Sequence, residues 1–228
     1  MMQPKDFFGA PVRIETARLV LDRHCLADFE DLAAMWAEPE VQRFVPVGVD
    51  RSGSWMRLLR YGGFWPMFGY GYWAVRHKES GRYAGDVGFG QLFREIEPSI
   101  DGLPEGGWVF SAWAHGQGIA SEALQAALAW LDAQGHKKSV CIIDPNNTAS
   151  LRLAARHGYI DPRTVKFRGE DTVLLARRLP GVPDHAESVQ GTERSRKSAH
   201  LPRPLLGANS QAGGNLSDDD AAFGTMRR

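Results

Sequence analysis

The segment from Gly107 to Leu124 contains the residues best suited to bind a ligand. Gly116 and Gly118 have no Cβ atom, so a ligand can approach the backbone closely at both positions. Beyond them, apolar residues recur at three- and four-residue steps, which predicts an amphipathic helix that starts on this glycine turn. The first N–H groups of a helix have no partner within the helix and attract an anion, and Ser121 adds a hydroxyl there. The segment therefore predicts a phosphate site.

One ligand class that such a turn could bind is a dinucleotide. The spacing Gly116-x-Gly118-x-x-Ser121 half-matches the dinucleotide fingerprint, with serine where glycine or alanine is expected. Asp144 ends the strand predicted after the helix, where a ribose-binding acid would lie. The glycines, however, follow several strands predicted to be antiparallel, whereas the dinucleotide turn opens its fold. NAD or NADP binding is therefore kept as a disfavoured alternative.

A different ligand is indicated by a family resemblance. Residues 115–120, His-Gly-Gln-Gly-Ile-Ala, resemble the pyrophosphate loop of the GNAT superfamily of acetyl-CoA-dependent N-acetyltransferases. Gly118 and Ala120 occupy matching places, and His115 departs from the usual Arg or Gln. The extension over residues 116–123 is similar to the ribosomal-protein N-terminal acetyltransferase (RimJ/RimL-like) branch in particular.

Two further segments carry the same resemblance. Residues 15–23 are similar to the branch's opening pattern, ETxRLxLR. Residues 144–159 are similar to its pattern PxNxxSxRxxxKxGF, although Arg156 replaces the usual lysine and Tyr159 the usual phenylalanine. The matching positions of this second pattern are Pro145, Asn147, Ser150, Arg152, Gly158 and Tyr159. The resemblance covers about residues 10–180.

Hydrophobic periodicity and turn residues predict the elements that must position these motifs. Helices are predicted after the glycine turn and over residues 28–36, 51–67 and 148–157, with the 51–67 region broken by Gly62, Gly63 and Pro66. Strands are predicted over residues 13–23, 69–77, 83–93, 108–112, 139–143, 159–167 and 171–178, with a loop over 94–106. This is the GNAT order, so the resemblance implies an α/β (α+β) domain over residues 1–180. Its sheet would be seven-stranded, mixed and splayed at the centre, with about four flanking helices. Residues 181–228 are poor in large apolar side chains, which predicts a disordered C-terminal tail.

The resemblance also implies which residues bind acetyl-CoA. The strand before the turn would pair with the pantetheine arm through its backbone, and the turn would hold the pyrophosphate through its amides. Asn147 would contact the pantetheine or acetyl region, although the same residue could simply cap its helix. The implied cofactor-binding residues are Val109, Phe110, Ser111, His115, Gln117, Gly118, Ile119, Ala120, Ser121 and Asn147.

Two residues are candidates for catalysis. Attack on a thioester requires a neutral amine, so a carboxylate must accept a proton. Glu105 falls at the glutamate of the family's EIGY pattern, although it could instead be a solvated loop acid beside Glu95, Glu97 and Asp101. The tyrosine that many family members use as general acid is replaced by Ala154, so Ser150 is the nearest matched hydroxyl. The family places the acceptor against a wall that here contains Trp36, Phe44 and Trp65, which could equally be core aromatics.

The predicted reaction is direct transfer of an acetyl group from acetyl-CoA to a primary amine in a ternary complex, with no metal. The sequence does not identify the amine, which could belong to a protein N-terminus or to a small molecule. A CoA-binding module that has lost catalysis is the alternative from another class, and the missing tyrosine is its support. Oligomeric state is open, and a homodimer is compatible with the sequence.

Composition limits the other partners. Lysine plus arginine equals aspartate plus glutamate at 27 each, so charge gives no argument for nucleic acid or an anionic membrane as a partner. Cys25 and Cys141 are too few for a disulfide framework, and no cysteines or histidines lie at metal-ligand spacing. No apolar run is long enough to span a bilayer, and the N-terminus does not resemble a signal peptide. The predicted location is the cytoplasm.

Overall fold

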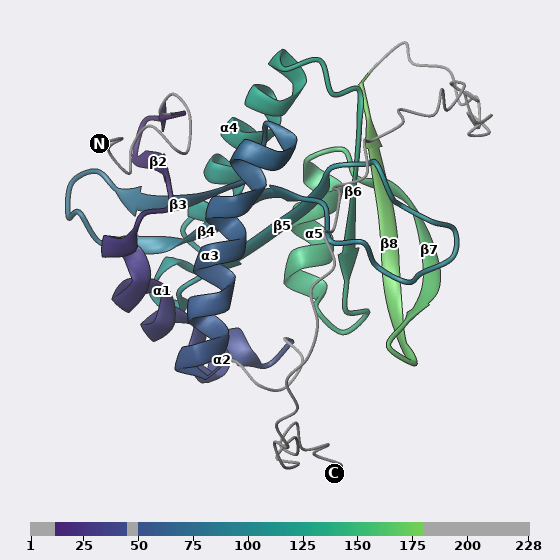
Figure 1. Ribbon diagram of the computed structural model, residues 1–228, viewed down its shortest axis with the longest axis horizontal. Coiled ribbons are helices and arrows are strands. Elements are labelled where there is room, and N and C mark those ends of the chain that lie inside the picture. The colour runs from purple at the N-terminus through teal and green to yellow at the C-terminus, as the bar shows by residue number, and fades with distance from the viewer. Residues whose placement is uncertain (1–11, 45–49, 180–228) are drawn as a thin grey trace, which may run out of the picture. The chain divides into compact units, whose positions relative to one another are not determined.

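The computed structural model describes residues 12–44 and 50–179, and the tail predicted from residue 181 onward lies outside these ranges. The strands form one mixed sheet in the order β1-β2-β3-β4-β5-β6-β8-β7 (Figure 1). The strands are Ile14–Glu15 (β1), Leu19–Arg23 (β2), Tyr72–His77 (β3), Tyr83–Gly90 (β4), Glu105–Phe110 (β5), Lys138–Ile143 (β6), Ile160–Phe167 (β7) and Glu170–Arg178 (β8). The α-helices are Phe29–Trp36 (α1), Pro39–Gln42 (α2), Arg51–Phe68 (α3), Ile119–Ala133 (α4) and Thr148–Arg156 (α5). Short 3-10 helices cover Leu26–Asp28 and Ala112–Ala114.

The predicted α/β class is confirmed, but the sheet formed by the described residues has eight strands instead of seven. The extra strand arises because the segment predicted as one strand over residues 13–23 turns back on itself. Ile14 pairs with Leu21 in an antiparallel ladder, and the hydroxyl of Thr16 accepts a hydrogen bond from Leu19 N at 2.9 Å within the turn. The described residues form five α-helices where about four were predicted, and one of them, α2, is a single turn that starts at Pro39.

The prediction that Gly62, Gly63 and Pro66 break the second helical region is wrong, because α3 runs without interruption. Each glycine inside a helix costs about 1 kcal/mol relative to alanine. Burial of one large apolar side chain contributes about 1.5–3 kcal/mol, so packing outweighs the poor helix propensity. Pro66 lies in the last turn. The buried residues of α3 are Ser54, Leu58, Tyr61, Phe64 and Trp65.

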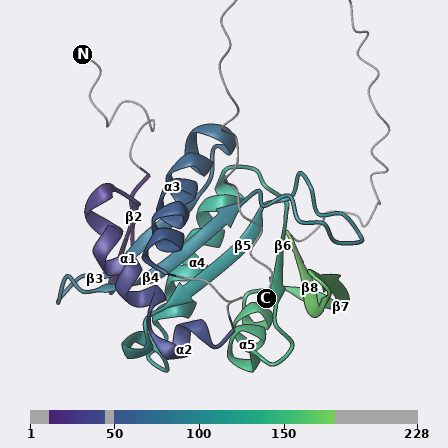
Figure 2. The ribbon, with the colours of Figure 1, turned by 60° about the horizontal axis from the view of Figure 1, so that its bottom comes forward.

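Helices cover both faces of the sheet (Figures 1 and 2). On one face α1 and α3 pack together and against β3 and β4, and their buried residues form a cluster that includes Leu32, Trp36, Tyr61 and Tyr72. On the other face α4 packs on β2, β4 and β5 through Leu124, Leu128 and Leu131, among others. The described helices include none that is long and apolar enough to cross a membrane.

The sheet is interrupted at its centre, between β5 and β6. The two strands are parallel, and their register pairs Glu105 with Val140 and no further residues of the described chain. One more hydrogen bond joins this point, from Val140 N to Pro104 O at 3.0 Å. Every other neighbouring pair of strands is antiparallel, and nearly all of them pair at five or more positions. The splay predicted for the central sheet is therefore confirmed.

Candidate active site

A cavity of about 1260 Å³ lies where β5 and β6 part. Its walls come from β5 and the end of β6, the starts of α4 and α5, and α3 on the opposite side. Nine of the residues predicted from the sequence line it. They are Glu105, Val109, Phe110, His115, Gly118, Ala120, Ser121, Asn147 and Ser150. Ser111, Gln117 and Ile119 are not among its lining residues.

The peptide groups of β5 divide between its two edges. Ser111 N donates to Ala84 O of β4 at 2.9 Å. Because alternate residues of an antiparallel ladder direct their peptide groups to opposite edges, Val109 also faces β4, whereas Trp108 and Phe110 face the opening. Of the three strand residues predicted to pair with a ligand through the backbone, Phe110 therefore has its peptide group at the opening, as does Trp108, whereas the peptide groups of Val109 and Ser111 face β4. Pairing with a ligand stays a prediction.

The glycine turn has the conformation that the sequence predicts. Gly116 and Gly118 have φ angles of 72° and 76°, in the left-handed region that non-glycine residues avoid at about 1–2 kcal/mol. Gly118 is the residue before α4, and its carbonyl accepts the first helical bond, from Glu122 N at 3.0 Å. The N–H groups of the first three helical residues have no partner within the helix. Since Gly118, Ala120 and Ser121 line the cavity, its end at α4 suits a phosphate.

A second segment, far away in the sequence, anchors the glycine turn. The carboxylate of Glu122 in the first turn of α4 accepts hydrogen bonds from Thr16 Oγ1, from Arg18 N at 2.9 Å and from Arg18 Nε at 2.7 Å. Arg18 also donates to Gln117 O at 2.9 Å. Burial acts to raise the pKa of Glu122, but the bonds from Thr16 and Arg18 outweigh it and lower that pKa. We call this arrangement the Arg18–Glu122 clamp, and it joins two of the three motifs that carry the family resemblance.

Two histidines make polar contacts on either side of the glycine turn. His115 Nε2 lies 2.9 Å from Phe110 O, and because a carbonyl can only accept, this nitrogen carries the proton. His157, which follows α5, places Nε2 2.8 Å from the hydroxyl of Ser121. Burial, assisted by the charges of Arg156 and Arg177, lowers the pKa of His157. His115 is therefore tied to β5, and Ser121 already has a protein partner.

The start of α5 forms the other wall of the opening. Asn147 caps this helix, because its side chain accepts from Ser150 N at 3.1 Å. The capping role considered for Asn147 is thus present, and the residue lines the cavity as well. Trp108 Nε1 donates to Ser150 Oγ at 3.3 Å, which leaves the hydroxyl proton of Ser150 available for another acceptor.

Glu105 is buried and not a loop residue. It is the first residue of β5, with 4% of its surface exposed, at the point where β5 and β6 part. Arg94, from the loop before β5, donates Nε to both carboxylate oxygens at 2.8 and 2.7 Å. The interpretation of Glu105 as a solvated loop acid is therefore wrong, and the carboxylate faces the cavity as one half of an ion pair.

Two buried tyrosines stand over the same part of β5. Tyr61 and Tyr72 stack with their ring centroids 4.2 Å apart, and both line the cavity. A Cβ atom on Gly107 would lie 2.2 Å from the Tyr72 hydroxyl, so the missing side chain is what makes room for this hydroxyl. Burial, together with Tyr61 and Glu105, raises the pKa of Tyr72 well above its usual value. Burial likewise raises the pKa of Tyr61, so both hydroxyls keep their protons.

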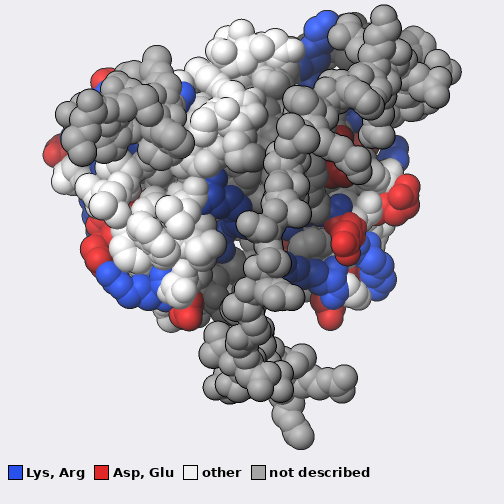
Figure 3. All heavy atoms as spheres, in the orientation of Figure 1, with Lys and Arg blue, Asp and Glu red and all other residues white. Residues whose placement is uncertain are grey.

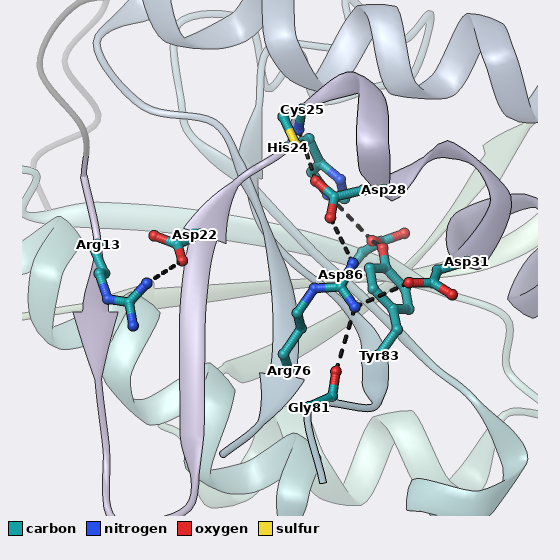
Figure 4. A network of polar contacts seen from close by, with 10 residues as sticks. All are labelled: Arg13, Asp22, His24, Cys25, Asp28, Asp31, Arg76, Gly81, Tyr83 and Asp86. Atoms are coloured by element: carbon teal, nitrogen blue, oxygen red, sulfur yellow. Dashed lines mark hydrogen bonds and ion pairs between the residues drawn. The ribbon is translucent and has the colours of Figure 1, made fainter. Parts of the chain in front are cut away.

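Buried polar contacts around Asp86 support the aromatic wall, and Figure 4 shows His24 and Tyr83 beside this carboxylate. Asp86 of β4 is fully buried and accepts from Trp36 Nε1 at 3.2 Å and from the hydroxyl of Tyr83, with His24 Nε2 at 3.2 Å from the same carboxylate. These bonds fix the Trp36 ring, which lines the cavity as the family resemblance implies. Phe44 also lines the cavity, but Trp65 packs on Trp73 and Trp130 and is a core residue.

The charged side chains that line the cavity are mostly basic. Of the acids predicted in the loop over residues 94–106, Glu95 and Glu105 line the cavity, whereas Glu97 and Asp101 are not among its lining residues. Six arginines line it, and these are Arg43, Arg57, Arg60, Arg94, Arg156 and Arg168. Within the described chain, no group of three or more His, Cys, Asp or Glu side chains could hold a metal ion.

The structure adds residues that the sequence patterns do not identify. Arg60 and Tyr61 follow Arg57 by three and four positions, a spacing that places all three on one face of a helix. This spacing is a signal in the sequence from which the two arginines could have been identified. Arg94 lies in a loop, where no periodicity relates it to Glu105. Tyr72 comes from β3, and the pairing of β3 with β4 and of β4 with β5 had to be known before its hydroxyl could be placed over Gly107.

Comparison with known proteins gives a consistent result. Residues 18–160 match the family model described as an acetyltransferase (GNAT) domain. A solved structure described as a GnaT-family acetyltransferase from Bordetella pertussis is 32% identical and superposes with a TM-score of 0.63, over 72% of this chain and 98% of that one. A ribosomal-protein-S5-alanine acetyltransferase from Vibrio fischeri, at 17% identity, shares the fold with a TM-score of 0.60, over 75% of this chain and 98% of that one.

A curated relative is similar over a shorter stretch. The uncharacterized protein YkkB of Bacillus subtilis (strain 168) is 29% identical over 112 residues, which are 49% of this chain. The matched region spans 63% of that relative, less than two thirds of its length.

Proposed function

Because this chain belongs to the GNAT acetyltransferase family, we propose that it transfers an acetyl group from acetyl-CoA to a primary amine by direct attack in a ternary complex. The observation that carries this proposal is the parting of β5 and β6 at Glu105, with a left-handed glycine turn and the start of α4 at the cavity wall. A narrow ligand with a phosphate at one end and a reactive group at the other fits such a cavity.

The residues that would hold acetyl-CoA are backbone groups for the most part. Amides of residues 117–121 would bind the pyrophosphate at the start of α4. The peptide groups of Trp108 and Phe110, which face the opening, would pair with the pantetheine arm. One of these amides would also donate to the thioester oxygen as negative charge develops on it. Asn147 would contribute its remaining amide hydrogens on the α5 side.

Glu105 is the proposed general base. It is buried at the point where the strands part, on the side of Tyr72, so an acceptor amine that enters between α3 and β5 would meet it. The demand on this base depends on the amine. An α-amine with a pKa of about 8 is partly neutral at neutral pH, whereas a lysine-like amine near 10.4 is not.

Ser150 is the proposed proton donor to the departing thiolate. Its hydroxyl oxygen accepts from Trp108 Nε1, so its proton is free to be donated into the cavity. Ser150 would thus replace, as general acid, the tyrosine that many family members have at the position of Ala154.

Ligand-dependent thermal denaturation tests the class first. A ligand at a hundred times its dissociation constant stabilises the folded state by about 2.7 kcal/mol, which a melt detects. We expect stabilisation by acetyl-CoA and CoA, and thiol release when an amine is added. Stabilisation by acetyl-CoA without thiol release on a broad amine panel would favour a CoA-binding module instead. Stabilisation by NAD or NADP alone would refute the proposal.

Glu105→Gln tests the catalytic assignment. We expect kcat to fall by about 10²- to 10⁴-fold, the usual contribution of a general base, with acetyl-CoA binding retained. Arg94→Met is the matched control, because it breaks the same ion pair but keeps the carboxylate. If Arg94→Met loses as much activity as Glu105→Gln, the residue acts through the structure, and the assignment of a base is wrong. A cytoplasmic location and a homodimer stay predictions from the sequence.

A further inference from the structure

Helix α3 presents two arginines to the cavity. Arg57 and Arg60 both line it, one helical turn apart, next to Tyr61. Figure 3 shows basic side chains gathered beside the middle of α3 on this face of the molecule. These arginines lie on the side of the sheet that α1 and α3 cover, whereas α4, which begins at the glycine turn, packs on the other side. They are therefore poorly placed to serve the phosphate end of the cavity.

Arg57 is held in one orientation and lacks a partner for a buried donor. Its guanidinium carbon lies 3.5 Å from the centroid of the Trp36 ring, so the flat guanidinium stacks on this ring. The ring is itself fixed, because Trp36 Nε1 donates a hydrogen bond to Asp86. Within the described chain, Arg57 Nε is buried and has no hydrogen-bond partner. A buried charged donor without an acceptor is unfavourable, which indicates that an acceptor arrives with a ligand.

The carboxylates of the described residues do not supply that acceptor. Glu105 is paired with Arg94, and Asp86 is bonded to Trp36 and Tyr83. Glu40, Glu95 and Asp144 also line the cavity. In the part of the chain that the structure describes, no carboxylate oxygen lies within 4.0 Å of a guanidinium nitrogen of Arg57 or Arg60; the ion pairs found there involve other arginines.

We infer that Arg57 and Arg60 bind a carboxylate that the acceptor amine itself carries. A guanidinium stacked on a ring directs its N–H groups outward in its own plane, where two parallel N–H groups match the two oxygens of a carboxylate. Arg57 uses part of this capacity in a hydrogen bond to the side chain of Tyr61, and its Nε has no partner within the described chain. The inference rests on the proposed function and narrows its substrate. It selects amines with a nearby carboxylate, either free amino acids or peptides with an acidic residue close to the N-terminus. Polyamines and aminoglycosides, which are polycations, would be repelled.

Matched substrate pairs test this inference. Two sets of free amino acids, ω-amino acids of increasing chain length and L-amino acids, are each compared with their carboxamides. A third set compares tetrapeptides that have Asp or Glu at the second position with the same tetrapeptides that have Asn or Gln there. The first two sets represent free amino acids and the last represents protein N-termini. An aminoalkylphosphonate replaces the carboxylate by a different anion. The readout is thiol release from acetyl-CoA, with kcat and KM determined separately.

The variants are Arg57→Met and Arg60→Met, with Arg51→Met as control. Arg51 lies on the same helix but outside the cavity lining, where it pairs with Glu30. We expect wild type to prefer each productive carboxylate over its amide by roughly 10- to 150-fold in kcat/KM, mostly through KM, the change expected for a charge-assisted hydrogen bond. Arg57→Met should reduce this preference strongly and Arg60→Met more weakly, because each variant lowers kcat/KM for the carboxylates by more than it lowers kcat/KM for the amides. Arg51→Met should keep the preference of the wild type for carboxylates.

Three results would overturn the inference. One is an equal loss of activity by Arg57→Met on carboxylates and amides, which would mean that the arginine only supports the structure. Another is a preference for the phosphonate over every carboxylate, and the third is a preference for amides. If no amine is acetylated, calorimetric binding of the same pairs in the presence of CoA decides the matter. Arg57-dependent binding of carboxylates would then uphold the carboxylate site while the proposed transferase activity fails, and equal binding of both members would reject the site as well.

Discussion

The Arg18–Glu122 clamp makes a prediction whose size can be worked out from its contacts. Glu122→Ala removes an acceptor that receives three hydrogen bonds, from Thr16 Oγ1, Arg18 N and Arg18 Nε. At about 0.5–1.5 kcal/mol for each of the three bonds, and with about 0.3–1 kcal/mol for a carboxylate in the first turn of a helix, the free energy of unfolding should fall by roughly 2–5.5 kcal/mol.

Milder variants separate the charge from the geometry. Glu122→Gln keeps an oxygen for Thr16 and for the Arg18 amide but loses the ion pair, so we expect a loss of about 1–2 kcal/mol. Arg18→Met loses the ion pair and the bond to Gln117 O, for a similar loss. Because both variants remove the same ion pair, the double variant should be more stable than the sum predicts, by about 0.5–1 kcal/mol.

Urea unfolding measures these free energies, and titration with acetyl-CoA measures the consequence for the turn. We expect weaker acetyl-CoA binding in all three variants, because the amides of the glycine turn lose their anchor. Arg51→Met provides the matched control, since Arg51 and Glu30 form an ion pair whose side chains are 63% and 71% exposed, and it should change stability by less than about 0.5 kcal/mol. Strict additivity of the two single variants, or unchanged acetyl-CoA binding, would refute the role given to the clamp.

Two further predictions concern the cavity and the pH dependence of stability. Gly107→Ala would place a Cβ atom 2.2 Å from the Tyr72 hydroxyl, so we expect a loss of about 1–3 kcal/mol and a fall in activity, whereas Gly63→Ala, with open space around it, should be neutral or stabilising in the same urea and activity assays. The lowered pKa of His157 means that the folded protein binds this proton less readily than the unfolded chain. Its contribution to stability is therefore complete above the unfolded pKa of about 6.5 and is lost as the pH falls below that value. Urea titrations between about pH 8 and pH 5 should show a shallower loss for His157→Gln than for wild type, and an equal slope would contradict the assignment.

The features that the sequence predicted correctly are encoded by residues close together in the chain. Two glycines and the apolar period after them specify the turn and α4, and the asparagine three residues before Ser150 specifies the cap of α5. The splay came from the family resemblance and not from any residue pattern.

The features that it missed depend on contacts between distant segments. Arg18 and Glu122 are separated by 104 positions, and no local pattern relates them before the sheet is assembled. Glu105 looks like one of several loop acids until β5 is known to begin there and Arg94 is found against it. The continuity of α3 is a similar case, because Gly62, Gly63 and Pro66 all argue locally for a break. The packing of its buried side chains on the sheet, which decides the outcome, is not visible in the segment itself.

The parting of β5 and β6 gives this sheet edges in its interior as well as at its two ends. Unpaired strand edges are templates on which other chains can pair and aggregate, and proteins usually shorten, charge or cover them. Here the outer edges are β1, which is two residues long, and β7, most of whose residues are exposed. The inner edges, those of β5 and β6, are instead enclosed by α3, α4 and α5. A strand, which carries side chains on both faces, therefore cannot reach them, whereas a slender unbranched molecule can. The same walls that admit a ligand to this backbone therefore protect the protein from pairing with its own copies.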